Sequence, residues 1–117
     1  MDEAISFVSS ESEIVEAEGA SYFRELAEGA YGRIKDIDSI LGQFAIGWHV
    51  ERMAAVDRNI LRLAVYEFAL AEPRMPIGIA LNEAVELAKV YGDDNSPRFI
   101  NGVLANVVKG LQLLGRL

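Results

Sequence analysis

Apolar side chains recur at three- and four-residue steps along most of the chain, a spacing typical of amphipathic helices. The first stripe predicts one helix that follows Ser21, the expected N-cap, and ends at Gly42. Its apolar positions are Phe23, Leu26, Ala30, Ile34, Ile37 and Leu41. Gly29 and Gly32 lie inside this helix and each weakens it by up to about 1 kcal/mol relative to alanine, so we expect them to pack closely against another helix.

A second segment is apolar on nearly every face, which indicates a central, buried helix. This helix runs from about Val50 or Val56 to Ala71. Pro73 and Pro76 end it, because proline has no backbone N–H and disfavours the helical conformation in the residue before it. The connector between the first two helices is rich in large apolar side chains, namely Phe44, Ile46 and Trp48.

Two further helices are predicted towards the C-terminus. The first covers residues 77–91 and closes at Gly92, the expected C′ position. Residues 93–95 form a turn, after which Ser96 as N-cap and Pro97 as the first helical residue start the last helix. No segment shows the sustained alternation of a β-strand. The chain is therefore expected to be all-α, a compact bundle of about five helices.

Composition argues against an enzyme. The 117 residues fit one domain and include no cysteine, which excludes disulfides, Cys-ligated zinc and thiol nucleophiles. The one histidine, His49, excludes two-histidine metal sites, and without a nucleophile motif beside it we interpret it as structural or solvated. The adjacent acids of residues 93–95 lack calcium-loop spacing. We expect no catalysis, no metal and no cofactor.

The net charge of −7 is concentrated at one end of the chain. Residues 1–28 carry eight acids and one arginine, whereas residues 29–117 carry ten acids and ten bases. We expect residues 1–20 to be an acidic, partly ordered segment ahead of a helical domain of residues 21–117. The chain opens without the basic residues of a signal peptide and has no run long enough to span a membrane, so we expect a cytoplasmic protein.

Arginines and one aromatic residue are the candidates for contact with nucleic acid. Arg58 and Arg62 are i, i+4 neighbours, and their spacing alone favours ion pairs with Asp57 or Glu67 of the same helix. Arg98 lies at the start of the last helix, where free N–H groups also meet phosphate. Next to Arg98, an exposed phenylalanine ring could stack on a base.

Three stretches resemble the NusB transcription antitermination family, in the same order and at similar separations: VDRNILRLAVYE (56–67), PIGIALNEAVELAKVYG (76–92) and SPRFINGVL (96–104). With the segment that begins at Tyr22, the resemblance covers roughly residues 21–110. It implies an all-helical adaptor without enzymatic activity or cofactor. Such an adaptor binds single-stranded boxA-type RNA together with NusE, a small-subunit ribosomal protein, in an antitermination complex with RNA polymerase.

The resemblance also implies site residues. Matching the partner-facing surface of the family onto this chain gives the NusE-binding candidates Glu51, Asp57, Tyr66 and Glu67. The RNA-binding candidates are Arg98, Phe99, Arg58 and Arg62, of which the first two match the RNA-facing edge of the family.

One feature departs from the family, whose members begin with an arginine-rich helix. The first 28 residues here carry the opposite charge and would repel an RNA backbone. Either the first helix is missing from this chain, or the chain is a paralogue that has lost boxA binding. Without that helix, an apolar groove along Phe23, Leu26 and Ala30 would be covered by residues 1–15 or by a second copy in a homodimer.

Two other functions remain open on the sequence. A protein-only interaction module would keep the NusE-facing surface and lack RNA binding, which the acidic N-terminal segment favours. The RNA-binding domain of a ribosomal RNA cytosine methyltransferase shares this helical fold, and the chain would then be a fragment of that enzyme.

Overall fold

The computed structural model describes the backbone from residue 17 and the side chains from residue 24 to the C-terminus. Most of the predicted N-terminal segment 1–20, and the predicted folding back of residues 1–15, lie outside the described residues. In the described part, all regular elements are helical, which confirms the all-α prediction of about five helices. The elements are α2 (Ala17–Gly32), α3 (Ile34–Phe44), η1 (Val50–Arg52), α4 (Ala55–Val65), η2 (Tyr66–Leu70), α5 (Ile77–Tyr91) and α6 (Ser96–Leu113).

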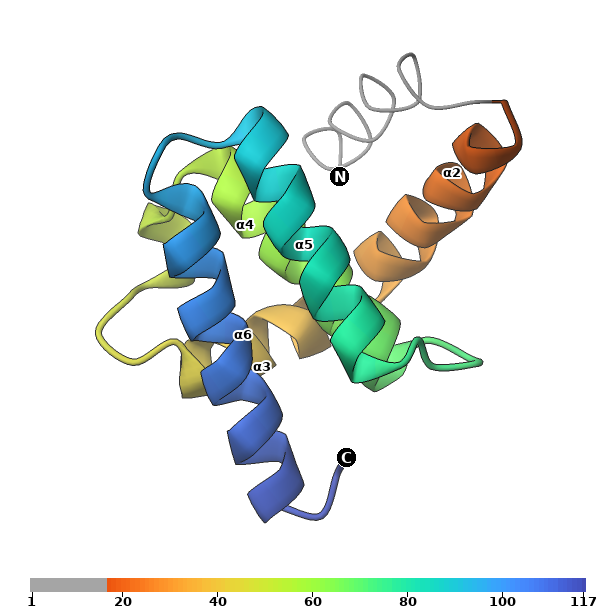
Figure 1. Cartoon of the computed structure of the whole chain (residues 1–117). Helices are drawn as coiled ribbons and strands as arrows, with labels where there is room; N and C mark the ends of the chain where they lie inside the picture. Colours follow the sequence, from red (N-terminus) through yellow and green to blue (C-terminus); the bar gives the residue numbers. More distant parts are fainter. Residues whose placement is uncertain (1–16) are drawn as a thin grey trace.

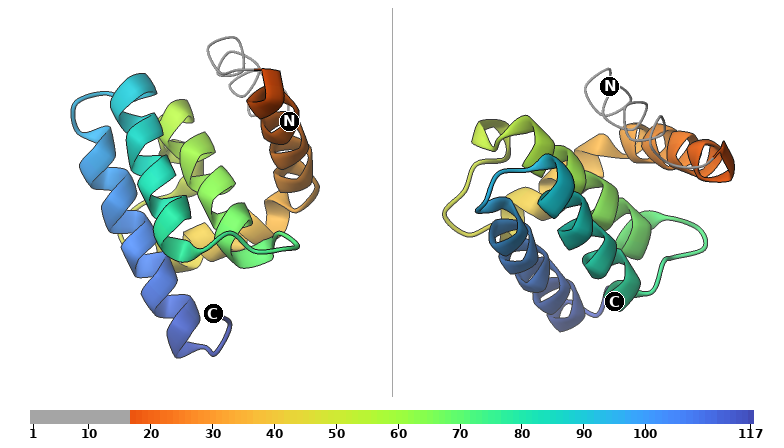
Figure 2. Two further views of the ribbon diagram at one scale, coloured as in Figure 1. Left: turned by 45° about the vertical axis from the view of Figure 1, so that its right-hand side comes forward. Right: turned by 45° about the horizontal axis from the view of Figure 1, so that its top comes forward.

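Helices α4, α5 and α6 lie side by side, and α3 crosses α4 and α6 (Figures 1 and 2). Helix α2 stands to one side of this group and contacts α4 and η2 through a short buried face of Leu26, Ala27 and Ala30. Since α4 contacts each of the other four α-helices, the predicted central helix is confirmed. A five-residue π-helical segment, η2, extends it to Leu70.

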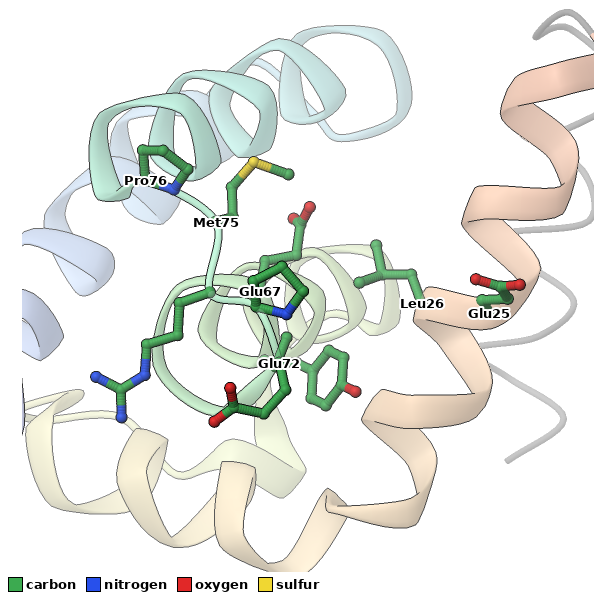
Figure 3. Close-up of a pocket in the computed structure, with 10 residues that line it drawn as sticks. Glu25, Leu26, Glu67, Glu72, Met75 and Pro76 are labelled. Atoms are coloured by element: carbon green, nitrogen blue, oxygen red, sulfur yellow. The ribbon is translucent and has the colours of Figure 1, made fainter.

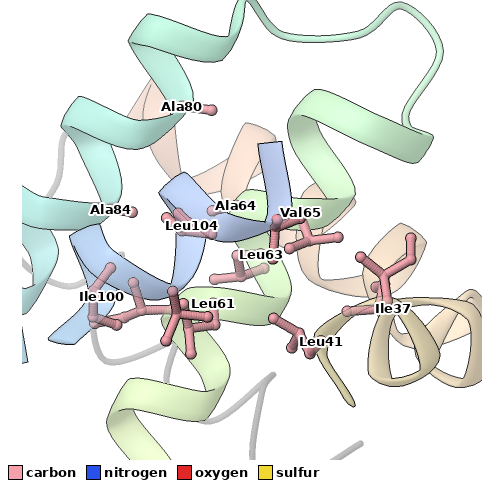
Figure 4. Packing of buried hydrophobic residues seen from close by; sticks show 14 of the residues in the cluster. Ile37, Leu41, Leu61, Leu63, Ala64, Val65, Ala80, Ala84, Ile100 and Leu104 are labelled. Carbon is pink, nitrogen blue, oxygen red and sulfur yellow. The ribbon is translucent and has the colours of Figure 1, made fainter. Parts of the chain in front are cut away.

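The hydrophobic core fills the space between α3, α4, α5 and α6 (Figure 4). Large side chains come from three of these helices and are almost completely buried: Ile37, Leu41, Ile60, Leu61, Val65, Ile100, Leu104 and Leu111. Helix α5 contributes only small buried residues, Ala80, Ala84 and Ala88, one turn apart. These small side chains let α5 lie close to α6, so the core consists of large residues packed against an alanine face.

The first predicted helix is wrong in its bounds, because two helices occupy that stretch. The backbone at Arg33 leaves the helical conformation (φ −117°, ψ 21°) and separates α2 from α3. The break turns α3 so that Ile37 and Leu41 face the core. Ser21 is not an N-cap, since α2 already includes Ala17, and α3 continues past Gly42 to Phe44.

The two glycines of that stretch differ. A Cβ at Gly29 would collide with the Tyr66 ring, which confirms close packing there. A Cβ at Gly32 would meet no atom within 4 Å, so close packing does not explain this glycine. Gly32 instead lies at the end of α2, where its low helix propensity favours the break.

The start of α6 lies one residue from the prediction. Asn95 occupies the N-cap position and Ser96 is the first helical residue. The capping oxygen comes from Asp93, which accepts hydrogen bonds from the backbone N–H groups of Asn95 at 2.9 Å and Ser96 at 3.1 Å. Gly92 has φ −90° rather than the left-handed conformation expected at C′. Glycine fits this position because a Cβ would collide with the Ser96 side chain.

Candidate functional site

An open groove of about 470 Å³ lies between the connector after α3, the start of α4 and the start of α6. We call it the Trp48 groove, lined chiefly by Trp48, Met53, Asp57, Asn95, Arg98 and Phe99. Trp48 is 54% exposed, and its ring meets that of Phe99 edge to face, with centroids 5.0 Å apart and planes at 71°. This aromatic contact anchors the connector to α6 beside an exposed cation, Arg98.

The turn before α6 determines where Arg98 and Phe99 lie. Besides the two backbone contacts of the Asp93 carboxylate, the Ser96 hydroxyl accepts a hydrogen bond from the Asp93 N–H at 3.0 Å. Ser96 is buried, and the closely packed Gly92 leaves room for it. The mutual bonds fix the direction in which α6 leaves the turn, so that its first turn presents Arg98 and Phe99 to the groove.

Asp57 supplies a buried carboxylate to the same groove. The residue is only 9% exposed and lies in the first turn of α4, where the helix dipole favours negative charge. Its Oδ1 atom is buried and has no hydrogen-bond partner within residues 24–117. Burial of an unsatisfied carboxylate oxygen is costly, and this oxygen is sealed from the groove, so only the other part of the carboxylate can face it.

A smaller hollow of about 260 Å³ lies on the other side of Trp48, lined by His49, Glu51, Asp38 and Arg62. Arg62 forms a bidentate ion pair with Asp38, in which Nε and Nη2 each donate to a carboxylate oxygen at 2.9 Å. The prediction that Arg62 pairs with an acid of its own helix is wrong, because its partner lies in α3. Glu51 is exposed at this hollow, in η1.

Arg58 lies closer to the core than its sequence pattern indicates. Its side chain is half-buried, and Nη1 donates to the backbone carbonyl of Met53 at 3.4 Å. Arg58 and Arg62 are thus both engaged in contacts within the protein. The contacts favour structural roles for these two arginines, and their role in RNA binding stays a prediction.

Tyr66 and Glu67 lie in a separate cleft of about 390 Å³ between α2 and the loop that leads to α5 (Figure 3). We call it the acidic cleft, because its lining includes three acids, Glu25, Glu67 and Glu72, and one base, Arg74, beside apolar residues such as Leu26 and Met75. Glu67 is 5% exposed, whereas Glu25 and Glu72 are exposed. Of the predicted groove residues, Leu26 lines this cleft, Ala30 is buried, and the side chain of Phe23 is outside the described part.

The predicted site residues therefore separate into two regions. Asp57, Arg98 and Phe99 meet in the Trp48 groove, and Glu51 and Arg62 lie just beyond Trp48. Tyr66 and Glu67 lie in the acidic cleft, whose lining has no residue in common with the lining of the Trp48 groove. Sequence reasoning missed Trp48 as a site residue. The available signal was a large aromatic side chain in an irregular connector, outside any helical stripe.

Residues 24–117 show one further perturbed carboxyl group outside the two regions described above. Partial burial raises the pKa of the Glu83 carboxyl above its ordinary value, but this residue of α5 lines neither the Trp48 groove nor the acidic cleft. The described residues contain no group of three His, Asp or Glu side chains placed to hold a metal ion. No helix of this part of the chain is long and apolar enough to cross a membrane.

Comparison with known proteins agrees with the helical arrangement. A family model described as the NusB family matches residues 1–109. The chain is 52% identical over 88 residues to the transcription antitermination protein NusB of Halothermothrix orenii, which covers 75% of this chain and 63% of that protein. It is 47% identical over 98 residues to NusB of Symbiobacterium thermophilum, covering 84% of this chain and 63% of that protein.

A solved structure of antitermination factors NusB and NusE in complex with double-stranded RNA contains a similar chain. It superposes with a TM-score of 0.71 at 31% identity, over 86% of this chain and 74% of that chain. The present chain spans less than two thirds of the length of the two relatives named above. By the family match, the sequence identities and the shared fold, the chain belongs to the NusB family.

Proposed function

We propose that this chain is an RNA-binding transcription antitermination factor without enzymatic activity. In this proposal it binds single-stranded boxA-type RNA together with a NusE-type ribosomal protein, as part of an RNA polymerase complex in the cytoplasm. Family membership and the names of its relatives support the proposal. They also favour it over a fragment of a cytosine methyltransferase, since these relatives are named as antitermination proteins.

The observation that carries the proposal is the meeting of Arg98, Phe99 and Trp48 at one groove. Proteins recognise single-stranded RNA by stacking its bases on aromatic rings and contacting its phosphates with cations. Arg98 is exposed and supplies the cation. Phe99 is half-buried and is held against Trp48, so the aromatic surface is rigid before RNA binds.

The acidic residues support a basic protein partner. Glu51 is exposed beside the Trp48 groove, and the acidic cleft brings Tyr66 and Glu67 together with Glu25 and Glu72. Complementary charge accelerates encounter and selects partners, so acidic surfaces of this kind suit a cationic ribosomal protein. A homodimer that covers the apolar groove along Phe23, Leu26 and Ala30 stays a prediction, for which light scattering on the full chain is the test.

Salt-dependent RNA binding tests this function. A boxA-type RNA should bind with an affinity that falls as salt rises, and NusE should strengthen binding. Arg98→Ala should weaken binding several-fold and lower the salt slope by about one unit. Lys109→Ala is the matched control, because Lys109 is an exposed cation on the same helix but does not line the Trp48 groove. Absence of binding at low salt, with and without NusE, contradicts the proposal.

A protein-only module is the second candidate, favoured by the net charge of −7 and the acidic cleft. In that case NusE binds while RNA affinity is negligible at every salt concentration. Asp57→Arg should then abolish NusE binding without any change in RNA affinity. Measuring the affinities for NusE and for RNA, on both the unmodified chain and Asp57→Arg, separates a protein-only module from an RNA-binding factor.

A further inference from the structure

We infer that a second phosphate contact of the RNA lies beyond the C-terminal end of α6, in a pocket of about 380 Å³ lined by Arg74 and Arg116. We call it the two-arginine pocket, and its other lining residues are Ala69, Leu70, Leu111 and Gly115. The inference rests on the proposed RNA binding and extends it, because this pocket and the Trp48 groove have no lining residue in common. The occupant is a backbone phosphate of the strand that continues from the RNA segment bound at the Trp48 groove.

The two arginines of the pocket are not neutralised by an acid. Both are exposed, and neither makes an ion pair within residues 24–117. Arg74 also borders the acidic cleft, but its hydrogen bond in this part of the protein goes to the backbone carbonyl of Arg116, at 3.2 Å. No residue that lines the two-arginine pocket is acidic. Two cations that line one pocket without a carboxylate create a positive potential that attracts an anion.

The way α6 ends fixes the backbone of Arg116. Gly115 has φ +71°, a left-handed conformation that glycine adopts without steric cost. The N–H groups of Gly115 and Arg116 then donate to the carbonyls of Gln112 at 3.0 Å and Leu111 at 2.8 Å, which is a Schellman cap. The next residue, Leu117, is partly buried against the core. Arg116 is therefore held on both sides before a ligand binds, which lowers the entropy lost on binding.

The same cap makes the end of α6 compatible with an anion. A helix C-terminus disfavours negative charge, because its last carbonyls are unpaired. Here the carbonyls of residues 110–112 all accept backbone N–H groups. Arg74 uses only Nη1 in its bond to Arg116, so most of its five N–H donors remain available. Guanidinium groups present paired donors that match the oxygens of a phosphate.

Helix α6 connects the two-arginine pocket to the Trp48 groove (Figure 1). Although the chain has a net charge of −7, residues 96–117 contain Arg98, Lys109 and Arg116 and no acid. From Arg98 to Leu113 the helix rises about 23 Å, a length that about seven nucleotides of a stacked strand cover. A strand bound at the Trp48 groove can therefore reach the pocket along a helix that carries no repelling charge.

RNAs of two lengths test the inference. The short RNA is a boxA-type element alone, and two long RNAs add about 12 uridines to its 5′ or its 3′ end. Each is added to the full chain with NusE, and affinity is measured from labelled RNA at several salt concentrations. One of the long RNAs should bind at least about fivefold tighter than the short RNA at low salt. Its salt slope should be steeper by about 0.7 for each added phosphate contact.

Variants assign this gain to the two-arginine pocket. Combined Arg74→Gln and Arg116→Gln should abolish the gain and leave the affinity for the short RNA unchanged. Arg74→Lys should keep the salt slope and lose part of the gain, because an ammonium group cannot donate in a bidentate manner. Lys109→Ala is the control, since Lys109 is an exposed cation of α6 that does not line the pocket. Urea unfolding of each variant shows that the fold is intact.

The Nε–H resonances of Arg74 and Arg116 give a readout independent of affinity. They should shift when the tighter-binding long RNA is added and should not shift with the short RNA. Inorganic phosphate, added at constant ionic strength, serves as the comparison for a free ion.

Four outcomes decide the inference. A gain that the combined glutamine substitutions remove, together with shifts of both arginine resonances, supports it. Long RNAs that bind no tighter than the short RNA, or that keep their gain in the combined variant, overturn the inference and leave the proposed function intact. Resonances that shift with inorganic phosphate but not with long RNA assign the pocket to the free ion and also overturn it. If the short RNA does not bind in any condition, the proposed function fails and the inference fails with it.

Discussion

Replacing Arg62 by methionine should destabilise the fold without weakening RNA binding. Both hydrogen bonds of the Arg62–Asp38 pair are 2.9 Å long, and the Arg62 and Asp38 side chains are 15% and 33% exposed. Fully exposed ion pairs contribute about 0–1 kcal/mol, and hydrogen bonds to charged groups about 1.5–3 kcal/mol. For a partly exposed, bidentate pair we therefore expect Arg62→Met to lower the free energy of unfolding by about 2 kcal/mol.

Urea unfolding in low and high salt measures this loss, and a double-mutant cycle with Asp38→Asn isolates the pair from other effects of each substitution. The coupling should shrink at high salt, because the pair is not fully buried. RNA affinity should change less than about twofold, since the guanidinium is already engaged by Asp38. Unchanged stability combined with a tenfold loss of RNA affinity would refute this reasoning and make Arg62 an RNA contact.

Three other predictions concern packing and pH. Gly110→Ala should lower the free energy of unfolding, measured with urea, by about 1–3 kcal/mol, because the added Cβ would collide with the Phe44 ring. Gly102→Ala, on the open side of the same helix, should leave the free energy of unfolding unchanged or raise it by up to about 1 kcal/mol. Phe68→Ala should cost about 3–5 kcal/mol, measured in the same way, because Phe68 is a fully buried aromatic residue. Partial burial raises the pKa of the Glu83 carboxyl, so the fold is more stable when this carboxyl is protonated. This contribution to the free energy of unfolding is fully present below the ordinary pKa of 4.5 and is lost as the pH rises through the raised pKa. Glu83→Gln should therefore raise the urea midpoint near neutral pH, and the gain should vanish towards about pH 4.

Helices with clear periodicity and local end signals could be predicted from the sequence. Helix α5 begins and ends where its apolar stripe, Pro76 and Gly92 place it, and α6 begins one residue from the predicted cap. These signals are local, since they depend on residues within one turn of the helix end. The resemblance to the NusB family supplied the remaining step, from a helical bundle to Arg98 and Phe99 as site residues.

Features that depend on tertiary contacts could not be predicted. The apolar stripe runs without interruption across Arg33, so the break between α2 and α3 has no periodic signal. The partner of Arg62 lies 24 residues away, beyond any i, i+4 rule. Trp48 meets Phe99 only because the irregular connector passes the start of α6. In each case the contact joins segments that are far apart in the sequence, and their positions relative to each other depend on how the hydrophobic core packs.

Hydrogen–deuterium exchange of the full chain with NusE, with and without a boxA-type RNA, tests most directly whether the Trp48 groove is the RNA site. RNA should protect the amides of residues 48–57 and of the first turn of α6, and should leave the exchange of residues 77–91 unchanged. Protection confined to residues 66–76 at the acidic cleft, or no protection by RNA at all, would contradict the account.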